Sequence, residues 1–283
     1  MTTLASESGD GTQPARATAR ASAWWSRLRP VLLAVTFPAL LLAVWHFATV
    51  GRPASLIPPP YDVWQELEDL AVGGINDDAY SRTLLTHLFA SMSRVYGGFA
   101  LALAVALPLG MLIGRVPIVR QLVDPTVQIL RPIPVTAWLP LAMIIFGLGP
   151  RSAIFLVFLG AFYPILLNTI FGVRSVEPRL FEAASMLGCS QQAQFFRVVL
   201  PAALPSIFTG MRLGLGFAWV VIVVGEMTGV QTGLGAIIME ARQLSRTEIV
   251  ISGMIVIGIF GFLSDQLVMW IGRRLLAWSP SHG

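Results

Sequence analysis

The sequence predicts an all-α integral membrane protein, a bundle of six membrane-spanning helices. Apolar residues make up 55% of its 283 residues and charged residues only 12%. The mean hydropathy is +0.73, and together these values lie far outside the range of soluble domains. The charges are also unevenly spaced, and leave several uncharged runs of the ~20 residues that a helix needs to cross ~30 Å of hydrocarbon. A soluble protein is therefore excluded.

The first 29 residues differ from the rest of the chain. Residues 1–29 are rich in Ala, Ser, Thr and Arg, a composition that predicts a disordered tail. The run of 22 uncharged residues between Arg29 and Arg52 is too long for the core of a signal peptide and lacks a small-x-small exit. We therefore expect a retained first membrane helix at the start of residues 30–82.

The same region, residues 30–82, ends in an amphipathic segment outside the membrane. Its sequence LIPPPYDVWQELEDL begins with Pro58-Pro59-Pro60, which favours an extended backbone. Val63, Leu67 and Leu70 then recur at helical spacing, so a short helix with one apolar face is expected at the outer surface.

Five further spans follow from the charge-poor runs. Gaps of 20, 19 and 22 uncharged residues lie between Arg94 and Arg115, between Arg131 and Arg151, and between Arg151 and Arg174. Only 13 uncharged residues separate Arg212 from Glu226, so the fifth helix must begin near Pro205 and include Arg212. The sixth is expected from about Ile249 to Ile271.

Arginine placement predicts the orientation, because basic residues favour cytoplasmic loops. With a cytoplasmic N-terminus, eleven arginines lie inside: Arg16, Arg20, Arg27, Arg29, Arg115, Arg120, Arg174, Arg179, Arg197, Arg273 and Arg274. Six lie outside: Arg52, Arg82, Arg94, Arg151, Arg242 and Arg246. Both termini, including a short tail at residues 276–283, are therefore expected in the cytoplasm.

A charged helix–turn segment, Glu182–Pro201, lies between two long apolar spans. Pro178 suits the first turn of a helix, and Gly188 is typical of a helix C-terminus. Ser190 can cap a second short helix that we expect to end at Pro201. Four apolar side chains fall on one face of the first helix: Leu180, Phe181, Ala184 and Leu187. A water-facing helix with an apolar face usually has a partner.

These residues also carry a family resemblance. Glu182-Ala183-Ala184, then Gly188 after three residues and Val198-Val199-Leu200-Pro201 after nine more, resembles the EAA loop of permease subunits of binding-protein-dependent ABC importers. The family usually has Ile at the position of Val198. The runs RPIPVTAWLPLAMIIFGLG and GEMTGVQTGLGAIIMEA are similar to the nitrate/sulfonate/taurine branch. The resemblance covers roughly residues 55–278.

The resemblance implies a fold and a function. It implies a type I importer permease (MetI-like) transmembrane domain over residues 83–275, placed in a bacterial inner membrane. Such permeases work as a pair, which we expect to be a homodimer here, with a pair of ABC ATPase subunits and an external solute-binding protein. The residues implied in ATPase coupling are Glu182, Ala183, Ala184, Gly188, Leu200 and Pro201. The implied solute is small and anionic, such as a sulfonate, taurine or nitrate.

Polar residues inside the spans are the other candidates. Glu226 is costly in a membrane unless it is paired or hydrated, so it either lines the solute path or forms a structural ion pair with an arginine such as Arg131. Arg131, Asn168 and Trp219 can likewise face the path or serve in packing. A buried arginine would attract an anionic solute.

Glycines at four-residue spacing predict close helix packing. Gly110 and Gly114 form one such pair and Gly210 and Gly214 another, a pattern that lets membrane helices approach. Around Thr228 the chain is expected to leave the regular helix, which is tolerated at that depth only where it lines a cavity or is covered by protein.

Several other functions lack their motifs. No GxxxxGK[ST] loop or HExxH occurs, so ATP hydrolysis is assigned to a partner chain and the protein is not an enzyme. The single cysteine, Cys189, cannot form an internal disulfide or a metal site by itself, and no cofactor, metal or nucleic acid is expected. An ion-gradient-driven secondary transporter is the main alternative, but no internal duplication supports it. An intramembrane enzyme would need a nucleophile–base pair that the spans lack.

Overall fold

The computed structural model describes residues 14–51, 57–76 and 78–276, and every regular element in these ranges is a helix. The helices are α1 (Pro14–Thr49), α2 (Pro60–Ala71), α3 (Leu84–Arg115), α4 (Pro117–Leu130), α5 (Leu139–Phe146), α6 (Pro150–Arg174), α7 (Pro178–Met186), α8 (Gln191–Gln194), α9 (Leu200–Glu226), α10 (Leu234–Gln243) and α11 (Thr247–Leu275). A 3₁₀ turn (Val135–Trp138) precedes α5 and a π-helical turn (Phe195–Val199) precedes α9. The chain divides into two units, Met1–Asp62 and Val63–Gly283.

The first unit consists mainly of α1. Its stretch Leu32–Thr49 is long and apolar enough to cross a membrane, as the sequence predicts. The tail prediction is wrong in part, because α1 already begins at Pro14. The Ala-rich composition of residues 14–29 that suggests disorder also favours helix once a stable helix follows it. Residues 1–13 lie outside the described residues, as do residues 277–283 of the expected C-terminal tail.

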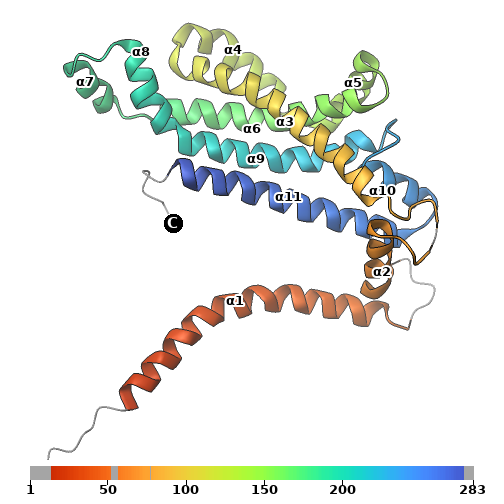
Figure 1. Cartoon of the computed structure of the whole chain (residues 1–283). Coiled ribbons are helices and arrows are strands. Elements are labelled where there is room, and N and C mark those ends of the chain that lie inside the picture. The colour runs from red at the N-terminus through yellow and green to blue at the C-terminus, as the bar shows by residue number, and fades with distance from the viewer. Residues whose placement is uncertain (1–13, 52–56, 77, 277–283) are drawn as a thin grey trace, which may run out of the picture. The chain divides into compact units, whose positions relative to one another are not determined.

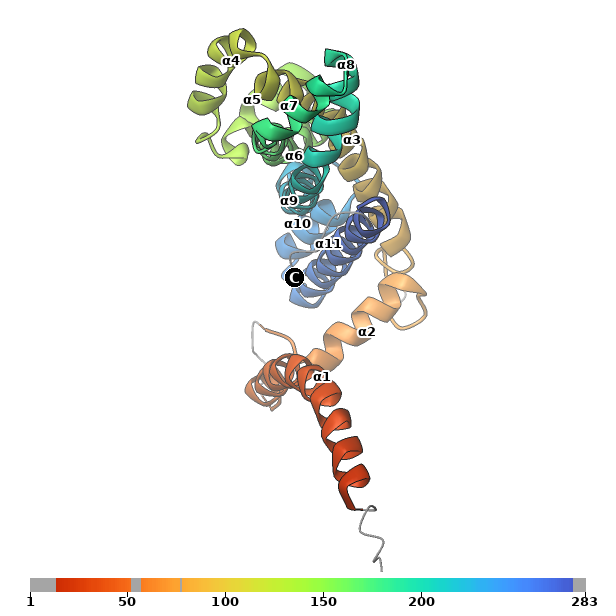
Figure 2. The same ribbon diagram turned by 90° about the vertical axis from the view of Figure 1, so that its left-hand side faces the viewer.

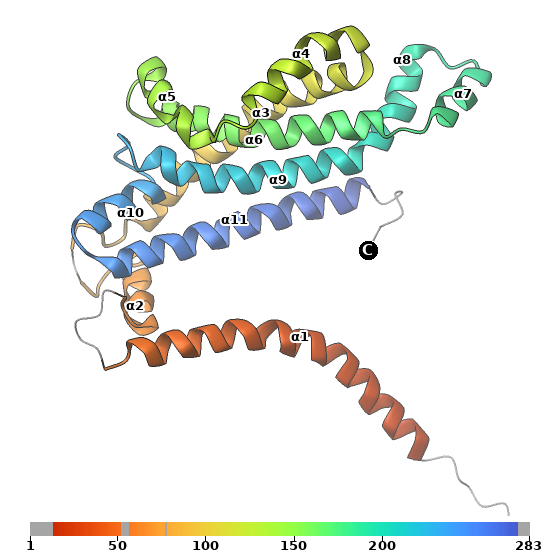
Figure 3. The ribbon, with the colours of Figure 1, turned by 180° about the vertical axis from the view of Figure 1, so that it is seen from behind.

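The second unit is a helical bundle. Helices α6 and α9 lie side by side, with α3 against α6 and α11 against α9 (Figures 1 and 3). Figure 2 shows α6 and α9 nearly end-on, with α3 and α11 running obliquely. Helices α7 and α8 lie at one end of this bundle and α10 at the other; the second of these is called the α10 end below. Counting α1, five single helices in the described residues can span a membrane, and a sixth if one bent pair is counted.

Glycines set the close packing of α3, α6 and α9. A Cβ on Gly110 would lie 2.7 Å from the Thr169 Cβ of α6, and one on Gly210 would lie 2.7 Å from the Asn168 Cβ. Both distances are well below van der Waals contact, so only glycine allows these helices to approach so closely. The predicted packing role of the small-residue pairs is confirmed.

The third predicted span, residues 132–150, is wrong as a single straight helix. The structure instead has α4 and the segment Val135–Phe146, which are bent by 92° at the break between them. The break falls on Pro132 and Pro134, which lack backbone donors and disfavour helix in the residues before them. The uncharged run therefore contains only the second half of a bent pair, and α4 is its first half.

The second span begins earlier than its charges suggest. Helix α3 starts at Leu84, so Arg94 lies inside it with 6% of its surface exposed. The fifth and sixth predicted spans are confirmed as α9 and α11. They are joined by an ion pair between Arg212 and Asp265, whose Nε and Oδ1 are 2.8 Å apart.

At the α10 end, an ionic cluster fixes the segment before α3. Arg246, after α10, pairs with Glu66 of α2 at 3.0 Å, with Glu248 at 3.1 Å and with Asp78. Burial raises the pKa of Glu66, and Arg246 opposes this shift. Val63 and Leu70 are buried, so the predicted apolar face of α2 packs on protein.

Candidate functional site

The segment from residue 178 to residue 201, called the hook below, begins with a helix whose limits follow from its sequence. Pro178 starts α7, where its missing N–H costs no hydrogen bond. Gly188 ends it with φ +73°. The Gly188 N–H donates to Ser185 O at 3.0 Å and the Cys189 N–H to Ala184 O at 3.0 Å, the two bonds of a Schellman motif. The predicted stop at Gly188 is confirmed.

The second half of the hook differs from the prediction in one respect. Ser190 caps α8 as expected, because its Oγ accepts from the Ala193 N–H at 3.3 Å. Pro201, however, does not end the helix, since α8, the π-turn and α9 run on without interruption from Gln191 to Glu226. The π-turn gives the ring of Pro201 room against the preceding turn, where a regular α-helix would clash. A continuous helix therefore joins the hook to the far end of the bundle.

The hook is anchored on one side and bare on the other. Ala184 is buried, and Phe181 packs on the apolar cluster around Val173 and Val199 while the Arg115 guanidinium lies 5.5 Å from its ring centre. The opposite side exposes four large apolar residues: Leu180, Met186, Leu187 and Phe196. The predicted apolar face is thus divided, since Phe181 and Ala184 face the protein while Leu180 and Leu187 face outward.

A second candidate site surrounds Glu226 at the α10 end. Its side chain has no exposed surface, and its Oε1 lies 2.5 Å from Nη1 of Arg94 on α3. Ser91 Oγ donates to the same carboxylate at 2.7 Å, and the Gly235 N–H donates at 3.0 Å. An ionised group this deep is tolerated only with such partners. The predicted partner, Arg131, is wrong: Arg94 pairs with Glu226, whereas Arg131 lies exposed at the end of α4.

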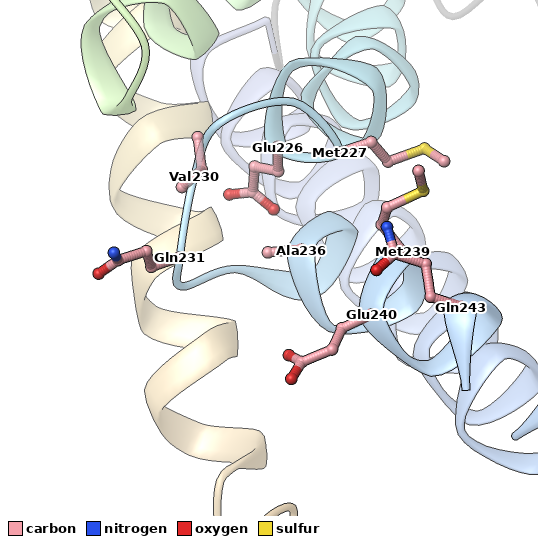
Figure 4. Close-up of a pocket in the computed structure, with 8 residues that line it drawn as sticks. All are labelled: Glu226, Met227, Val230, Gln231, Ala236, Met239, Glu240 and Gln243. Carbon is pink, nitrogen blue, oxygen red and sulfur yellow. The ribbon is translucent and has the colours of Figure 1, made fainter.

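A cavity of about 380 Å³ lies beside this carboxylate. Figure 4 shows its lining side chains, which come from the end of α9, the turn that follows and α10. They are Glu226, Met227, Val230, Gln231, Ala236, Met239, Glu240 and Gln243. The lining mixes thioethers, amides and carboxylates, so it can accept both apolar and hydrogen-bonding groups.

The remaining polar candidates have structural partners. Trp219 is buried, and its indole N–H donates to Ser264 Oγ at 3.0 Å. Asn168 is partly buried and donates to Pro164 O at 2.8 Å. The sequence reasoning missed Arg94 and Ser91, which lie three residues apart on one helix face. An arginine ten residues inside a long apolar helix is the signal that could have identified them.

Residues 106–277 match the family described as the binding-protein-dependent transport system inner membrane component. The taurine transport system permease protein of Escherichia coli is 37% identical over 92% of this chain and 93% of its own length. The nitrate import permease protein of a Synechocystis strain is 36% identical over 82% and 85%. The bicarbonate transport system permease protein of Synechococcus elongatus is 34% identical over 89% and 92%.

Among solved structures, the chain is similar to one from an inward-facing conformation of the MetNI methionine ABC transporter. The TM-score is 0.59 with 20% sequence identity, and the match covers 67% of this chain and 94% of that chain. This likeness shows that the two chains share a fold.

Proposed function

This chain belongs to the family of binding-protein-dependent transport system inner membrane components, and we propose that it forms half of the solute pathway of an ABC importer. A separate ATPase subunit bound at the hook drives the cycle, and an external binding protein delivers the solute. Two copies of the chain, as a homodimer, pair with two ATPase subunits.

The observation that carries this proposal is the exposed surface of the hook. Met186 and Leu187 are 89% and 83% exposed, on a short helix held rigidly by its Schellman motif and by Phe181. Apolar side chains presented by a fixed helix suit a groove in a partner protein. Glu182 and Ala183 lie exposed on the same helix, and Ala184 anchors it. Gly188 supplies the reversal, and Leu200 and Pro201 join it to α9.

The continuous helix from Gln191 to Glu226 supports coupling to the far end of the bundle. A displacement of the hook moves the start of this helix, and the tight glycine contacts of α9 with α6 transmit the movement as a rigid body. Nucleotide-driven closure of the ATPase subunits would thereby alternate access to the pathway.

The proposal also includes the orientation of the chain in the membrane and the class of solute. The arginine asymmetry supports a cytoplasmic location for the hook and both termini, and the α10 end would then face the binding protein. The taurine, nitrate and bicarbonate relatives support a small anionic or zwitterionic solute. A binding screen of these compounds on the cognate external protein identifies which one is taken.

The experiment that tests the proposal compares two charge substitutions. Leu187→Glu places a charge on the bare side of the hook, and Leu244→Glu makes the same change at the α10 end, where Leu244 is 59% exposed. Both variants are expected in the membrane at wild-type amounts. Leu187→Glu should lose co-purification of the ATPase subunit, and ATP-dependent uptake with it, whereas Leu244→Glu should keep the ATPase subunit. Equal retention of the ATPase by both variants, or uptake that needs no ATP, would refute the proposal.

A further inference from the structure

The turn between α9 and α10 leaves helical geometry beside the cavity. It spans residues 227–233 and includes Gly229 with φ +72° and Gly233 with φ +150°. Met227, Val230 and Gln231 of this turn line the cavity. The position of the turn therefore decides the shape of the cavity wall.

The start of α10 is capped by side chains of other helices. The first N–H groups of a helix have no partner within it. Here the Gly233 N–H donates to His87 Nδ1 at 3.0 Å and the Leu234 N–H to Ser91 Oγ at 2.8 Å, both on α3. The Gly235 N–H donates to the Glu226 carboxylate at 3.0 Å. The positive end of the α10 dipole also faces this carboxylate and attracts its negative charge.

Arg94 of α3 also binds both the turn and the Glu226 carboxylate. Its Nη1 donates to Thr232 O at 2.5 Å as well as to Glu226, and its Nη2 donates to Thr232 Oγ1 at 3.2 Å. One guanidinium thus holds both the end of α9 and the end of the turn. The network joins three helices, and its Ser91, Arg94 and Glu226 side chains are buried.

The turn has little space to move while this network is intact. A Cβ on Gly233 would lie 2.4 Å from the Glu226 carboxylate, and one on Gly235 would lie 2.6 Å from Val223 O. The backbone of the turn is therefore in direct contact with the groups that cap it, and no side chain separates them.

We propose that His87, Ser91 and Arg94 are positioning residues, which fix the cavity-bearing turn and the start of α10 on α3. The turn and α3 then move as one body, and the wall of the cavity keeps its shape while solute passes. The positioning role of these three residues concerns the chain alone, and the rigid movement of the turn with α3 is the second part of the proposal. The second part rests on the proposed function, because it concerns the transport cycle.

The test is amide hydrogen exchange of the peptide that contains Gly233, Leu234 and Gly235, in lipid nanodiscs. In the wild-type chain this peptide should exchange slowly and residues 228–231 quickly. Ser91→Ala removes the acceptor of the Leu234 N–H and should speed exchange about tenfold. Ser93→Ala is the matched control, because Ser93 lies on the same helix, is exposed and bonds only to Ala90 O in its own helix; its exchange should equal that of the wild type.

A second variant guards against a folding defect. The double substitution Arg94→Gln/Glu226→Gln removes both charges together, so no buried charge is left unpaired. It should insert normally and still exchange about tenfold faster over residues 233–235. Slow exchange in both variants, or fast exchange of this peptide in the wild-type chain, would overturn the positioning role.

The same peptide reports on the transport cycle. In the complex with its ATPase subunits, trapped with Mg·ATP and vanadate, exchange should stay within about twofold of the nucleotide-free complex. A tenfold increase would show that α10 separates from α3, and would contradict the rigid-body part. If the complex failed to hydrolyse ATP, the proposed function would fail while the result on the isolated chain would stand.

Discussion

The buried ion pair between Arg94 and Glu226 allows a quantitative prediction. The two side chains are 7% and 0% exposed, so neither charge is solvated by water. Replacing Arg94 with Gln leaves the carboxylate with only neutral donors, Ser91 and the Gly235 N–H. Leaving a buried charge unpaired costs about 3–5 kcal/mol, and we expect Arg94→Gln to lower the free energy of unfolding by this amount.

The reverse substitution should cost less. In Glu226→Gln the guanidinium of Arg94 keeps the carbonyl and hydroxyl of Thr232 as acceptors, and the new amide oxygen can still accept from Gly235. A lost hydrogen bond to a charged group costs about 1.5–3 kcal/mol. The double variant leaves no unpaired charge. Its loss in free energy of unfolding should therefore be smaller than the summed losses of the two single variants by at least about 2 kcal/mol.

The assay is the free energy of unfolding in bicelles, measured for the wild type, both single variants and the double variant. A coupling energy within about 0.5 kcal/mol of zero would refute the reasoning, because it would show that each charge is stabilised independently of the other. Arg94→Gln costing less than Glu226→Gln would contradict the assignment of Glu226 as the more deeply buried partner.

Three other predictions concern backbone conformation, helix packing and pH. Gly188→Val places a β-branched residue at φ +73°, at a cost of roughly 1–3 kcal/mol, and should weaken ATPase co-purification. Gly74→Val is the control: Gly74 has φ +96° with open space around it, so the substitution carries similar backbone strain far from the hook, and it should leave ATPase co-purification unchanged. Gly110→Leu should lower the melting temperature more than Gly97→Leu on the same helix, because a Cβ on Gly97 meets nothing within 4 Å; equal shifts would refute the packing argument. The Ser81 hydroxyl and the N–H groups of Ile75 and Asn76 lower the pKa of Asp69 below its ordinary 3.8. Its contribution to stability is therefore full above that value and is lost as the pH falls through the lower folded pKa, a loss that melting curves should show for the wild type and not for Asp69→Asn.

The hook could be predicted from the sequence because its signals are local. Pro178, Gly188 and Ser190 act on their immediate neighbours in the chain, and all three behave as expected. Pro201 was the exception. Its effect depends on whether the preceding turn can widen, and a sequence pattern does not reveal the π-turn.

The network around Glu226 could not be predicted in the same way. A count of charges treats Arg94 as the boundary of a span, whereas a partner 132 residues away lets it lie inside one. The prediction of a single third span was wrong for a related reason, because an uncharged run gives the length of a span and does not show whether it is straight. Pro132 and Pro134 were visible in the sequence, but their consequence required the fold.

The most direct test of ATPase binding at the hook is cross-linking from the hook itself. Cys189 is replaced by Ser, and Met186→Cys or Leu244→Cys is introduced in the assembled transporter, so that the single thiol lies at the hook or at the α10 end. A thiol-reactive photo-cross-linker, attached to the introduced cysteine and activated by light to insert into nearby C–H or N–H bonds, is expected to join Met186→Cys to the ATPase subunit and to leave Leu244→Cys unlinked to it. Cross-links to the ATPase from Leu244→Cys and none from Met186→Cys would contradict the account.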